Sequence, residues 1–305
     1  MKKVLKLTSY LLLSAGMFSI TSCGGGEEKK AENTEDIQED TTKTVSAGVL
    51  NMGGELFSIP SPIQTAMLIQ GSGAQYDKSI LNSKENISQY STDYSKALNL
   101  GIYGADLGYV SMYNKTQDAI IYLTAVKKLS DELGVSSAFN ENTMKRFQDN
   151  MSNKDSMTML VGLAYREGNA FLQQNKRTDM SSLILVGGWI ESLNFAISVN
   201  KVKPAEDVKR RIADQKQTLN SIVKLLSQYD SKVEYADLID QLKDLSKVYD
   251  GVIYKYTFEQ PETNEATKTT TINSHSDVTI TKEQIDEITA KVEAIRKKIV
   301  SPAKA

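Results

Sequence analysis

The chain has 305 residues, with 36 Lys and Arg against 38 Asp and Glu, one Cys and one His. This balance argues against nucleic-acid binding, which requires a basic surface. The single Cys and single His exclude an internal disulfide and a zinc site built on these residue types, which leaves only oxygen-ligated Ca²⁺ or Mg²⁺ sites. The sequence has no EF-hand loop, and no cofactor is expected.

Residues 1–22 have the pattern of a secretory signal peptide. Three lysines lie within the first six residues, and the apolar core over 11–20 is too short for a membrane span. The exit sequence ITSC at 20–23 resembles the lipobox of bacterial lipoproteins. In that family the signal is cleaved before the cysteine, which then carries the lipid. The resemblance therefore implies that Cys23 is lipidated and holds the mature chain on a membrane of the cell envelope.

Residues 23–45 form the lipidated cysteine and an expected flexible tether. The stretch after Cys23 is rich in Gly, Glu, Asp and Thr and has too few large apolar residues to fold. Its start, GGGEEKK, resembles the acidic export signals of surface lipoproteins in Bacteroidota, although any polar tether has a similar composition. We expect an outer-membrane lipoprotein, with its surface or periplasmic face left open. Signal cleavage leaves 33 basic and 38 acidic residues, a charge of −5. This charge argues against electrostatic adhesion to anionic lipid, so we expect the anchor alone to attach the protein to the membrane.

Residues 46–202 are predicted to form a helical bundle, because apolar residues recur mostly at helical spacing. Helices are expected at 62–70, 92–113, from a break at 114–117 to Gly134, 140–150, 154–176 and 181–200. The break is assigned to a capping box at 114–117. The apolar segment 183–199 contains Glu191 and Asn194 and is shorter than a span, so we interpret it as a buried core helix. The predicted fold class is all-α.

The sequence LGIYGADLGYV at 100–110 raises the question of a phosphate-binding loop. Its glycines are three and four residues apart, which matches neither G-x-G-x-x-G nor the P-loop pattern. This spacing is that of one helix face. Gly187 and Gly188 are expected to thin a second helix similarly. We therefore predict a continuous small-residue seam for close helix packing, made of Ala97, Gly101, Gly104, Ala105, Gly108 and Met112.

Residues 203–305 have a different pattern. Apolar residues alternate spacings of three and four over 208–229, 235–249 and 285–299. Such narrow seams predict three antiparallel helices with coiled-coil-like packing, the first of them continuous from Pro204. Gln215 is a polar residue in the first seam, where it either sets the register or lies at an exposed end. A capping box at 281–284 begins the last helix.

Between the second and third of these helices, residues 252–280 are predicted to form a β-hairpin insertion. Apolar residues alternate over 252–258, and the Thr-rich run 267–273 favours a strand. The tip is expected at 261–265, and a third short strand at 277–280 is left open. A two-stranded hairpin is marginal alone, so this one either leans on the helices as a decorated connection or binds something.

Polar residues inside the predicted core helices form the candidate site. Buried charges must be paired or hydrogen-bonded. One interpretation is a satisfied network that fixes the helix register, in which Arg166 pairs with Asp106 or Glu191. The other is a polar pocket or a carboxylate metal site. The candidate residues are Asp106, Arg166, Glu167, Glu191 and Asn194.

The sequence contains no recognisable catalytic motif. His275 falls in the predicted hairpin and is interpreted as an exposed loop residue, and no G-x-S-x-G motif exists. A carboxylate-dependent hydrolase stays open, because its two acids need no fixed spacing. The expected function is a non-enzymatic interaction or scaffold module that binds another envelope protein. The alternatives are a solute-binding lipoprotein with a pocket near Asp106, Arg166 and Glu191, or such a hydrolase.

Several stretches together resemble a group of predicted lipoproteins found in Bacteroidota. They are the lipobox, the polar tether, IPSPIQTAMLIQGSGAQYDKSILN, YGADLGY and LVGGWIESL. The resemblance covers most of the mature chain. It implies an envelope location and a helical fold, and it carries over no catalytic residue.

Overall fold

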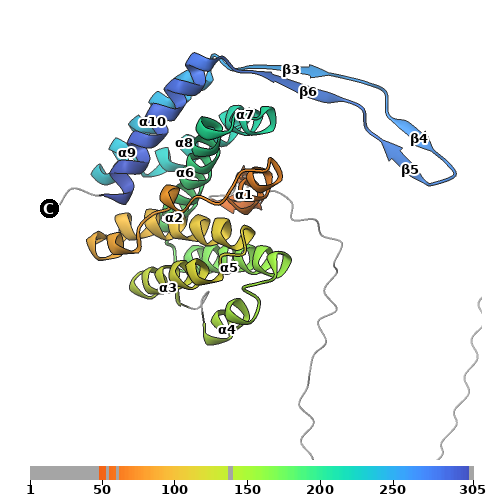
Figure 1. Ribbon diagram of the computed structural model, residues 1–305. Coiled ribbons are helices and arrows are strands. Elements are labelled where there is room, and N and C mark those ends of the chain that lie inside the picture. The colour runs from red at the N-terminus through yellow and green to blue at the C-terminus, as the bar shows by residue number, and fades with distance from the viewer. Residues whose placement is uncertain (1–47, 53–54, 60–61, 137–139, 302–305) are drawn as a thin grey trace, which may run out of the picture. The chain divides into compact units, whose positions relative to one another are not determined.

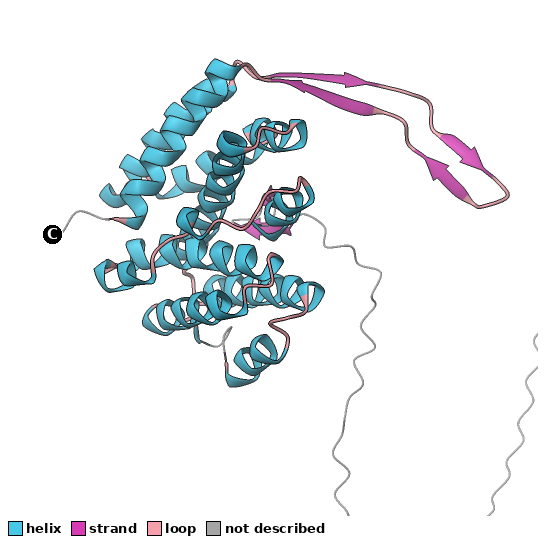
Figure 2. Ribbon diagram, viewed as in Figure 1, coloured by secondary structure: helices cyan, strands magenta, loops and turns pink. Residues whose placement is uncertain are grey.

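The computed structural model describes residues 48–52, 55–59, 62–136 and 140–301. The described residues all belong to one compact unit. The predicted signal peptide, Cys23 and the tether lie outside the described residues. Within the described part, helices dominate and strands occur only as hairpins (Figure 1, Figure 2), which confirms the all-α class.

The helices follow the predicted order. They are α1 (Pro62–Gly71), α2 (Asp93–Met112), α3 (Thr116–Glu132), α4 (Glu141–Asp149), α5 (Lys154–Gln174), α6 (Thr178–Val202), α7 (Glu206–Ala213), α8 (Lys216–Leu226), α9 (Val233–Tyr249) and α10 (Lys282–Val300). The 3₁₀ turns are η1 (Lys78–Ile80), η2 (Lys84–Gln89) and η4 (Ser227–Tyr229), and the strands are β1 (Gly48–Met52), β2 (Glu55–Ile59), β3 (Ile253–Thr257), β4 (Glu262–Asn264), β5 (Thr269–Thr271) and β6 (His275–Thr279).

The β1–β2 hairpin is an element that the sequence analysis missed. Its strands pair antiparallel, with Met52 opposite Glu55. The Gly53-Gly54 pair between them is a two-residue hairpin signal. Two short strands before a long helical region give too weak a pattern to stand out against the helical periodicity.

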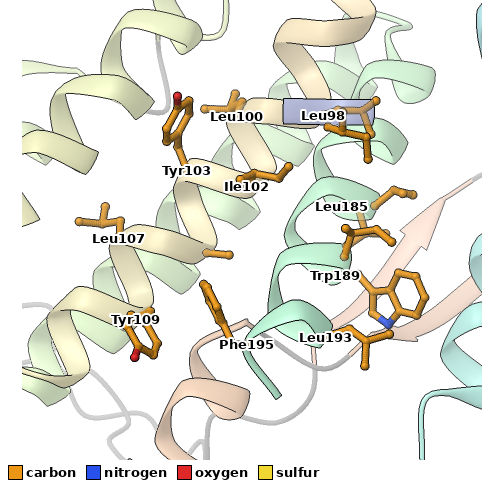
Figure 3. Packing of buried hydrophobic residues seen from close by; sticks show 14 of the residues in the cluster. Leu98, Leu100, Ile102, Tyr103, Leu107, Tyr109, Leu185, Trp189, Leu193 and Phe195 are labelled. Atoms are coloured by element: carbon orange, nitrogen blue, oxygen red, sulfur yellow. The ribbon is translucent and has the colours of Figure 1, made fainter. Parts of the chain in front are cut away.

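Helices α2 and α6 cross at the centre of the fold (Figure 3), and their backbones meet at glycines. A Cβ atom on Gly101 would lie 1.9 Å from the carbonyl oxygen of Ile184. A Cβ atom on Gly187 would lie 1.9 Å from the carbonyl oxygen of Leu98. No side chain fits at either position, so the predicted close helix contact is confirmed at Gly101 and Gly187. Large buried side chains surround this crossing, among them Leu98, Ile102, Tyr109, Trp189 and Phe195.

The other glycines of the predicted seam have different neighbours. A Cβ atom on Gly108 would lie 3.4 Å from the side chain of Ile63 in α1. A Cβ atom on Gly104 would meet nothing within 4 Å. The prediction of one continuous contact is therefore wrong. The close contact with α6 centres on Gly101, and Gly104 lies beside a cavity instead.

Helix α6 is a core helix, as predicted. Among the described residues it is the one helix long and apolar enough to cross a membrane, but 89% of its most apolar window is buried inside the protein. It contacts α1, α2, α5, α7, α8 and α10. Its polar residues Glu191 and Asn194 are buried as well.

Helices α8, α9 and α10 form the predicted C-terminal helical unit, with α9 packed on both others. The predicted first helix of this unit is not continuous, because it breaks between α7 and α8. At the break, the Tyr249 hydroxyl donates to the Ile212 carbonyl oxygen at 2.9 Å, and the Tyr254 hydroxyl donates to the Ala213 carbonyl oxygen. These tertiary hydrogen bonds satisfy carbonyl groups that a continuous helix would satisfy itself.

Gln215 lies at this break and is buried. Its Oε1 accepts a hydrogen bond from Trp189 Nε1 of α6 at 2.9 Å, and its Nε2 donates to the Arg211 carbonyl oxygen at 2.9 Å. The interpretation of an exposed helix end is therefore wrong. Gln215 joins α6 to the α7–α8 segment and fixes how the two meet.

The hairpin insertion consists of two successive ladders. β3 pairs antiparallel with β6, and β4 pairs antiparallel with β5. Pro261, which has no N–H group to donate, lies between β3 and β4. The chain continues past this gap and turns at 265–268, so the predicted tip at 261–265 is wrong. The short strand left open at 277–280 is present as part of β6, and β6 rather than the Thr-rich run pairs with β3.

Side chains cap several helices where predicted. The capping box at Thr281 and Gln284 is confirmed. The capping box expected at 114–117 is wrong, because α3 begins without a side-chain cap. Instead, Asn114 ends α2 in the left-handed region (φ 54°), and the Lys115 N–H donates to the Val110 carbonyl oxygen at 3.0 Å. This is a Schellman ending, which separates the two helices without a capping box.

Replacing Gly101 with Ala is expected to destabilise the fold, whereas the same change at Gly104 is expected to stabilise it. The new methyl group on residue 101 overlaps the Ile184 backbone, and such overpacking costs about 1–3 kcal/mol or more. The methyl group on residue 104 meets no atom, and Ala is better than Gly in a helix interior by about 1 kcal/mol. Chemical denaturation of both variants measures the free energy of unfolding. Effects of the same sign would contradict the crossing geometry.

Candidate functional site

Three charged side chains from three helices meet in the core. Asp106 comes from α2, Glu191 from α6 and Arg296 from α10, and we call them the acid–arginine cluster. Arg296 Nε lies 2.5 Å from Glu191 Oε2, and Arg296 Nη2 lies 2.7 Å from Glu191 Oε1. The Glu191 side chain is fully buried and the Arg296 side chain is 16% exposed. This bidentate contact is the strongest hydrogen-bond geometry for an arginine–carboxylate pair.

Asp106 is the acid of this cluster whose pKa is raised. Burial, followed by the nearby Glu191 carboxylate, raises the pKa of Asp106 well above its usual range, and Arg296 opposes this less strongly. Asp106 Oδ2 accepts a hydrogen bond from the Asn82 backbone N–H at 3.2 Å, while Oδ1 finds no donor among the described residues. The raised pKa favours the protonated form of Asp106, which can donate a hydrogen bond to a nearby carboxylate.

Polar side chains next to the cluster hold the C-terminal end of α10. The Tyr90 hydroxyl donates to the Val300 carbonyl oxygen at 3.2 Å, and Asn99 Nδ2 donates to the Ile299 carbonyl oxygen at 3.0 Å. Asn82 Nδ2 donates to both Tyr90 Oη and Asn99 Oδ1. The last carbonyl groups of a helix have no partner within it. Side chains from α2 and the loop before it therefore complete α10.

The structure places the predicted polar residues in two environments. Asp106, Glu191 and Asn194 are buried, and Asn194 Nδ2 donates to the Ile80 carbonyl oxygen at 3.3 Å. Arg166 and Glu167 are exposed on α5. The predicted pairing of Arg166 with Asp106 or Glu191 is therefore wrong, and so is the prediction that Arg166 and Glu167 belong to a buried polar network.

Arg296 takes the position that the sequence analysis gave to Arg166. It follows Ile295 of the apolar seam in α10 and lies 105 residues from Glu191 along the chain. Its place at the edge of that seam is the only sequence signal for partial burial. The identity of its partner depends on which helix packs against α6, and no spacing along the chain contains that information.

Neither of the two cavities described below is lined by Asp106, Glu191 or Arg166. Within the part of the chain that the structure describes, no group of three or more His, Cys, Asp or Glu side chains is arranged to hold a metal ion. His275 is half exposed as expected, but on strand β6 rather than in a loop.

The larger cavity, of about 50 Å³, lies under α5, and we call it the α5 cavity. A second cavity of about 10 Å³ lies beside Trp189 and Gln215. Residues of α2, α3, α4, α5 and α6 enclose the α5 cavity, and no lining residue is charged. Its apolar walls include Leu100, Leu107, Val126, Phe147, Val161 and Leu172.

Gly104 and the α5 cavity each lower the stability of the folded protein. A glycine in a helix interior costs about 1 kcal/mol relative to alanine. An apolar void adds about 24 cal/mol per Å³, or about 1 kcal/mol at this volume. At Gly101, close backbone contact offsets the cost of a glycine in the helix. At Gly104 no atom lies within 4 Å of the Cβ position, so no contact offsets this cost.

Three uncharged polar side chains also line the α5 cavity. Ser181 Oγ donates to Asn169 Oδ1, which joins α5 to α6. Burial raises the pKa of Tyr165, so its hydroxyl keeps its proton. Among the described residues, no hydrogen bond of the Tyr165 hydroxyl is found.

Comparison of the chain with protein-family models, with curated proteins and with solved structures finds no match. The function must therefore be inferred from the closed ionic cluster, the uncharged cavity and the surface of this chain itself.

Replacing Arg296 with Met is expected to destabilise the fold by about 3–5 kcal/mol, because Glu191 becomes a buried charge without its partner. The matched change Arg166→Met removes an exposed charge from α5 and is expected to cost about 0.5 kcal/mol or less. Urea denaturation at neutral pH measures both values. Similar losses in the two variants would show that Glu191 does not depend on Arg296.

Asp106 is expected to make the folded state less stable as the pH rises above the ordinary Asp value of about 3.9. The folded protein keeps the Asp106 proton while the unfolded chain releases it, so each pH unit between the two pKa values costs about 1.4 kcal/mol. Asp106→Asn keeps a hydrogen-bond donor and has no such proton. Its stability relative to the wild type is expected to improve steadily from about pH 4.5 upward in urea denaturation. A difference that stays constant with pH would mean that Asp106 is ionised in the folded state.

Proposed function

We propose that this protein is a lipid-anchored, non-enzymatic interaction module of the bacterial cell envelope, and that the hairpin β3–β6 is its binding element. The observation that carries the proposal is the exposure of large apolar side chains on this hairpin. Between 62% and 75% of the surface of each is exposed, for Ile253, Tyr256, Phe258 and Ile272. A cluster of exposed apolar side chains on a soluble surface marks an interaction site more often than chance exposure does.

Among the described residues, helices support the hairpin at its base. Arg210 Nη1 of α7 donates to the Ser276 carbonyl oxygen at 3.1 Å, and the Tyr254 hydroxyl donates to the Ala213 carbonyl oxygen of the same helix. Beyond the base, β4 and β5 are exposed throughout, and Figure 1 draws them away from the helices. Within the part of the chain that the structure describes, the outer ladder therefore has no covering layer.

The hairpin has the chemistry for adding a strand from another protein. Each of its strands pairs with a single neighbour, so the outer edges of the ladders keep free N–H and C=O groups. Proteins usually protect such edges, because they attract other strands. A partner with an extended apolar segment can pair with an edge through its main chain and cover the exposed aromatic side chains. Main-chain hydrogen bonds then supply affinity, and the side chains supply specificity.

The membrane anchor in this proposal rests on the sequence. The signal peptide, the ITSC sequence that ends at Cys23 and the polar tether support an outer-membrane lipoprotein. The resemblance to predicted lipoproteins of Bacteroidota supports the same location. A membrane-held chain with an exposed binding hairpin can tie another envelope protein to that membrane.

The acid–arginine cluster weighs against the two alternative functions. A solute pocket near Asp106, Arg166 and Glu191 needs polar groups that face open space, yet Glu191 is paired in the core and Arg166 lies exposed on α5. A carboxylate-dependent hydrolase needs two acids that face a substrate. Asp106 and Glu191 are instead buried in the core, where burial and the Glu191 carboxylate raise the pKa of Asp106.

Changing Tyr256, Phe258 and Ile272 together to Ser is expected to abolish partner binding without unfolding the protein, because these side chains are exposed. The control variant changes Val202 and Val233 to Ser, two residues that are 85% and 88% exposed outside the hairpin. Tagged full-length proteins are cross-linked in cells and isolated from solubilised envelopes. Wild type and control are expected to recover one stoichiometric partner, and the hairpin variant at least about tenfold less of it.

Equal recovery by the hairpin variant, or no stoichiometric partner with the wild type, would contradict the proposed function. Equal circular dichroism and Tm among the three proteins would show that folding is not the cause of a loss. The same fractions test the anchor, since Cys23→Ala is expected to leave the membrane fraction. A membrane-bound Cys23→Ala protein would rule out lipidation as the means of attachment.

A further inference from the structure

The α5 cavity is a space that the fold keeps open although its own residues could fill it. Gly104 lies within α2, and a Cβ atom there would meet nothing within 4 Å. Ala or a larger residue at this position would therefore occupy part of the void without a clash. Close packing explains Gly101 and Gly108, but it does not explain Gly104. Unlike Gly162, which has similar open space, Gly104 lines the cavity.

The lining restricts the charge of any occupant of the cavity. Apolar side chains make most of the wall, and no charged residue lines it. A carboxylate or phosphate inside would have no cation to pair with, and burial of an unpaired charge is strongly unfavourable. Tyr165 and Asn169 provide uncharged polar groups on one helix face, four residues apart in α5. A neutral molecule with one polar atom suits this arrangement.

The volume restricts the shape of the occupant. The cavity measures about 50 Å³, while an apolar protein cavity of about 150 Å³ admits benzene. A ring therefore requires the helices to move apart, whereas the end of an unbranched chain does not. The lining residues that are only half buried include Val161, Tyr165 and Gly168 of α5, and also Gly104 of α2 and Ile184 of α6. The route inward therefore lies along α5, on the side where it faces Gly104 and Ile184.

From these observations we propose that the α5 cavity binds the end of a slender, uncharged hydrocarbon chain that enters beside α5 and lies against Gly104. The chain end contacts the apolar walls, and a hydroxyl or carbonyl group of the ligand lies near Tyr165 or Asn169. This site is separate from the hairpin and does not depend on the proposed function. Its occupant is a small molecule, and the hairpin's is a protein.

The test uses the mature chain with Cys23→Ala in buffer without detergent, because detergent tails are themselves hydrocarbon chains. The probes are 1-hexanol, cyclohexanol and hexanoate, which share six carbons and differ in shape or charge. Isothermal titration is expected to detect 1-hexanol binding, with cyclohexanol and hexanoate each at least about tenfold weaker. Amide chemical shifts are expected to change in α5 and around Gly104, and to stay unchanged in the hairpin.

Two matched variants locate the site. Gly104→Leu fills the cavity and is expected to weaken 1-hexanol binding at least about tenfold while Tm stays equal or rises. Gly162 lies in α5, has open space around its Cβ position and does not line the cavity. The Gly162→Leu variant is therefore expected to bind 1-hexanol as the wild type does. Gly104→Ala, which adds one methyl group, is expected to weaken binding by an intermediate factor even if the Leu variant folds poorly.

Unchanged 1-hexanol binding in both Gly104 variants would overturn the proposal, as would wild-type protein that binds none of the three probes. Equal affinity for 1-hexanol and hexanoate would overturn the claim that the occupant is uncharged. Loss of partner recovery by the hairpin variant leaves these outcomes unaffected, so the two proposals fail separately.

Discussion

The backbone contact between α2 and α6 is the constraint on which the rest of the structure depends. At Gly101 and Gly187 no Cβ atom separates the two helices, so they approach as closely as their carbonyl groups permit. About one turn further along each helix lie Asp106 and Glu191, and the close crossing brings their carboxyl groups together in a dry interior. Two carboxylates cannot both stay charged there. One keeps its proton, and the other requires a cation.

Arg296 is that cation, and its ion pair with Glu191 joins α10 to the core helix α6. It reaches Glu191 from α10, while Asn99 of α2 and Tyr90 of the preceding loop take the last carbonyl groups of the same helix. Apolar packing alone tolerates sliding of one helix along another, because it has no direction. The ion pair and these hydrogen bonds are directional, so they set the position of α10 on the core. The base of the hairpin, which precedes α10 directly, is positioned with it.

Two features of the molecule have no part in this network. The α5 cavity lies away from the acid–arginine cluster, and its glycine gains no packing in return for its cost. The outer hairpin has large apolar side chains in water and no covering layer. Within the described residues, these are two places where the fold leaves apolar surface uncovered. Both call for something outside the chain, a small apolar molecule in one case and a protein strand in the other.

The sequence by itself determined the elements that depend on local chemistry. Helical periodicity, the capping box at Thr281 and the apolar seam of α10 each act within a few residues, so the all-α class, most helix positions and the buried state of Glu191 could be predicted. Only the tertiary structure decided the pairings. Arg296, and not Arg166, pairs with Glu191. Tyrosine hydroxyls bind carbonyl groups where the helix ends after Ala213. Among glycines three and four residues apart, Gly101 packs against α6 while Gly104 faces a void. These outcomes depend on which helices meet and at what angle, and contacts between residues some 40 to 105 positions apart leave no local trace in the sequence.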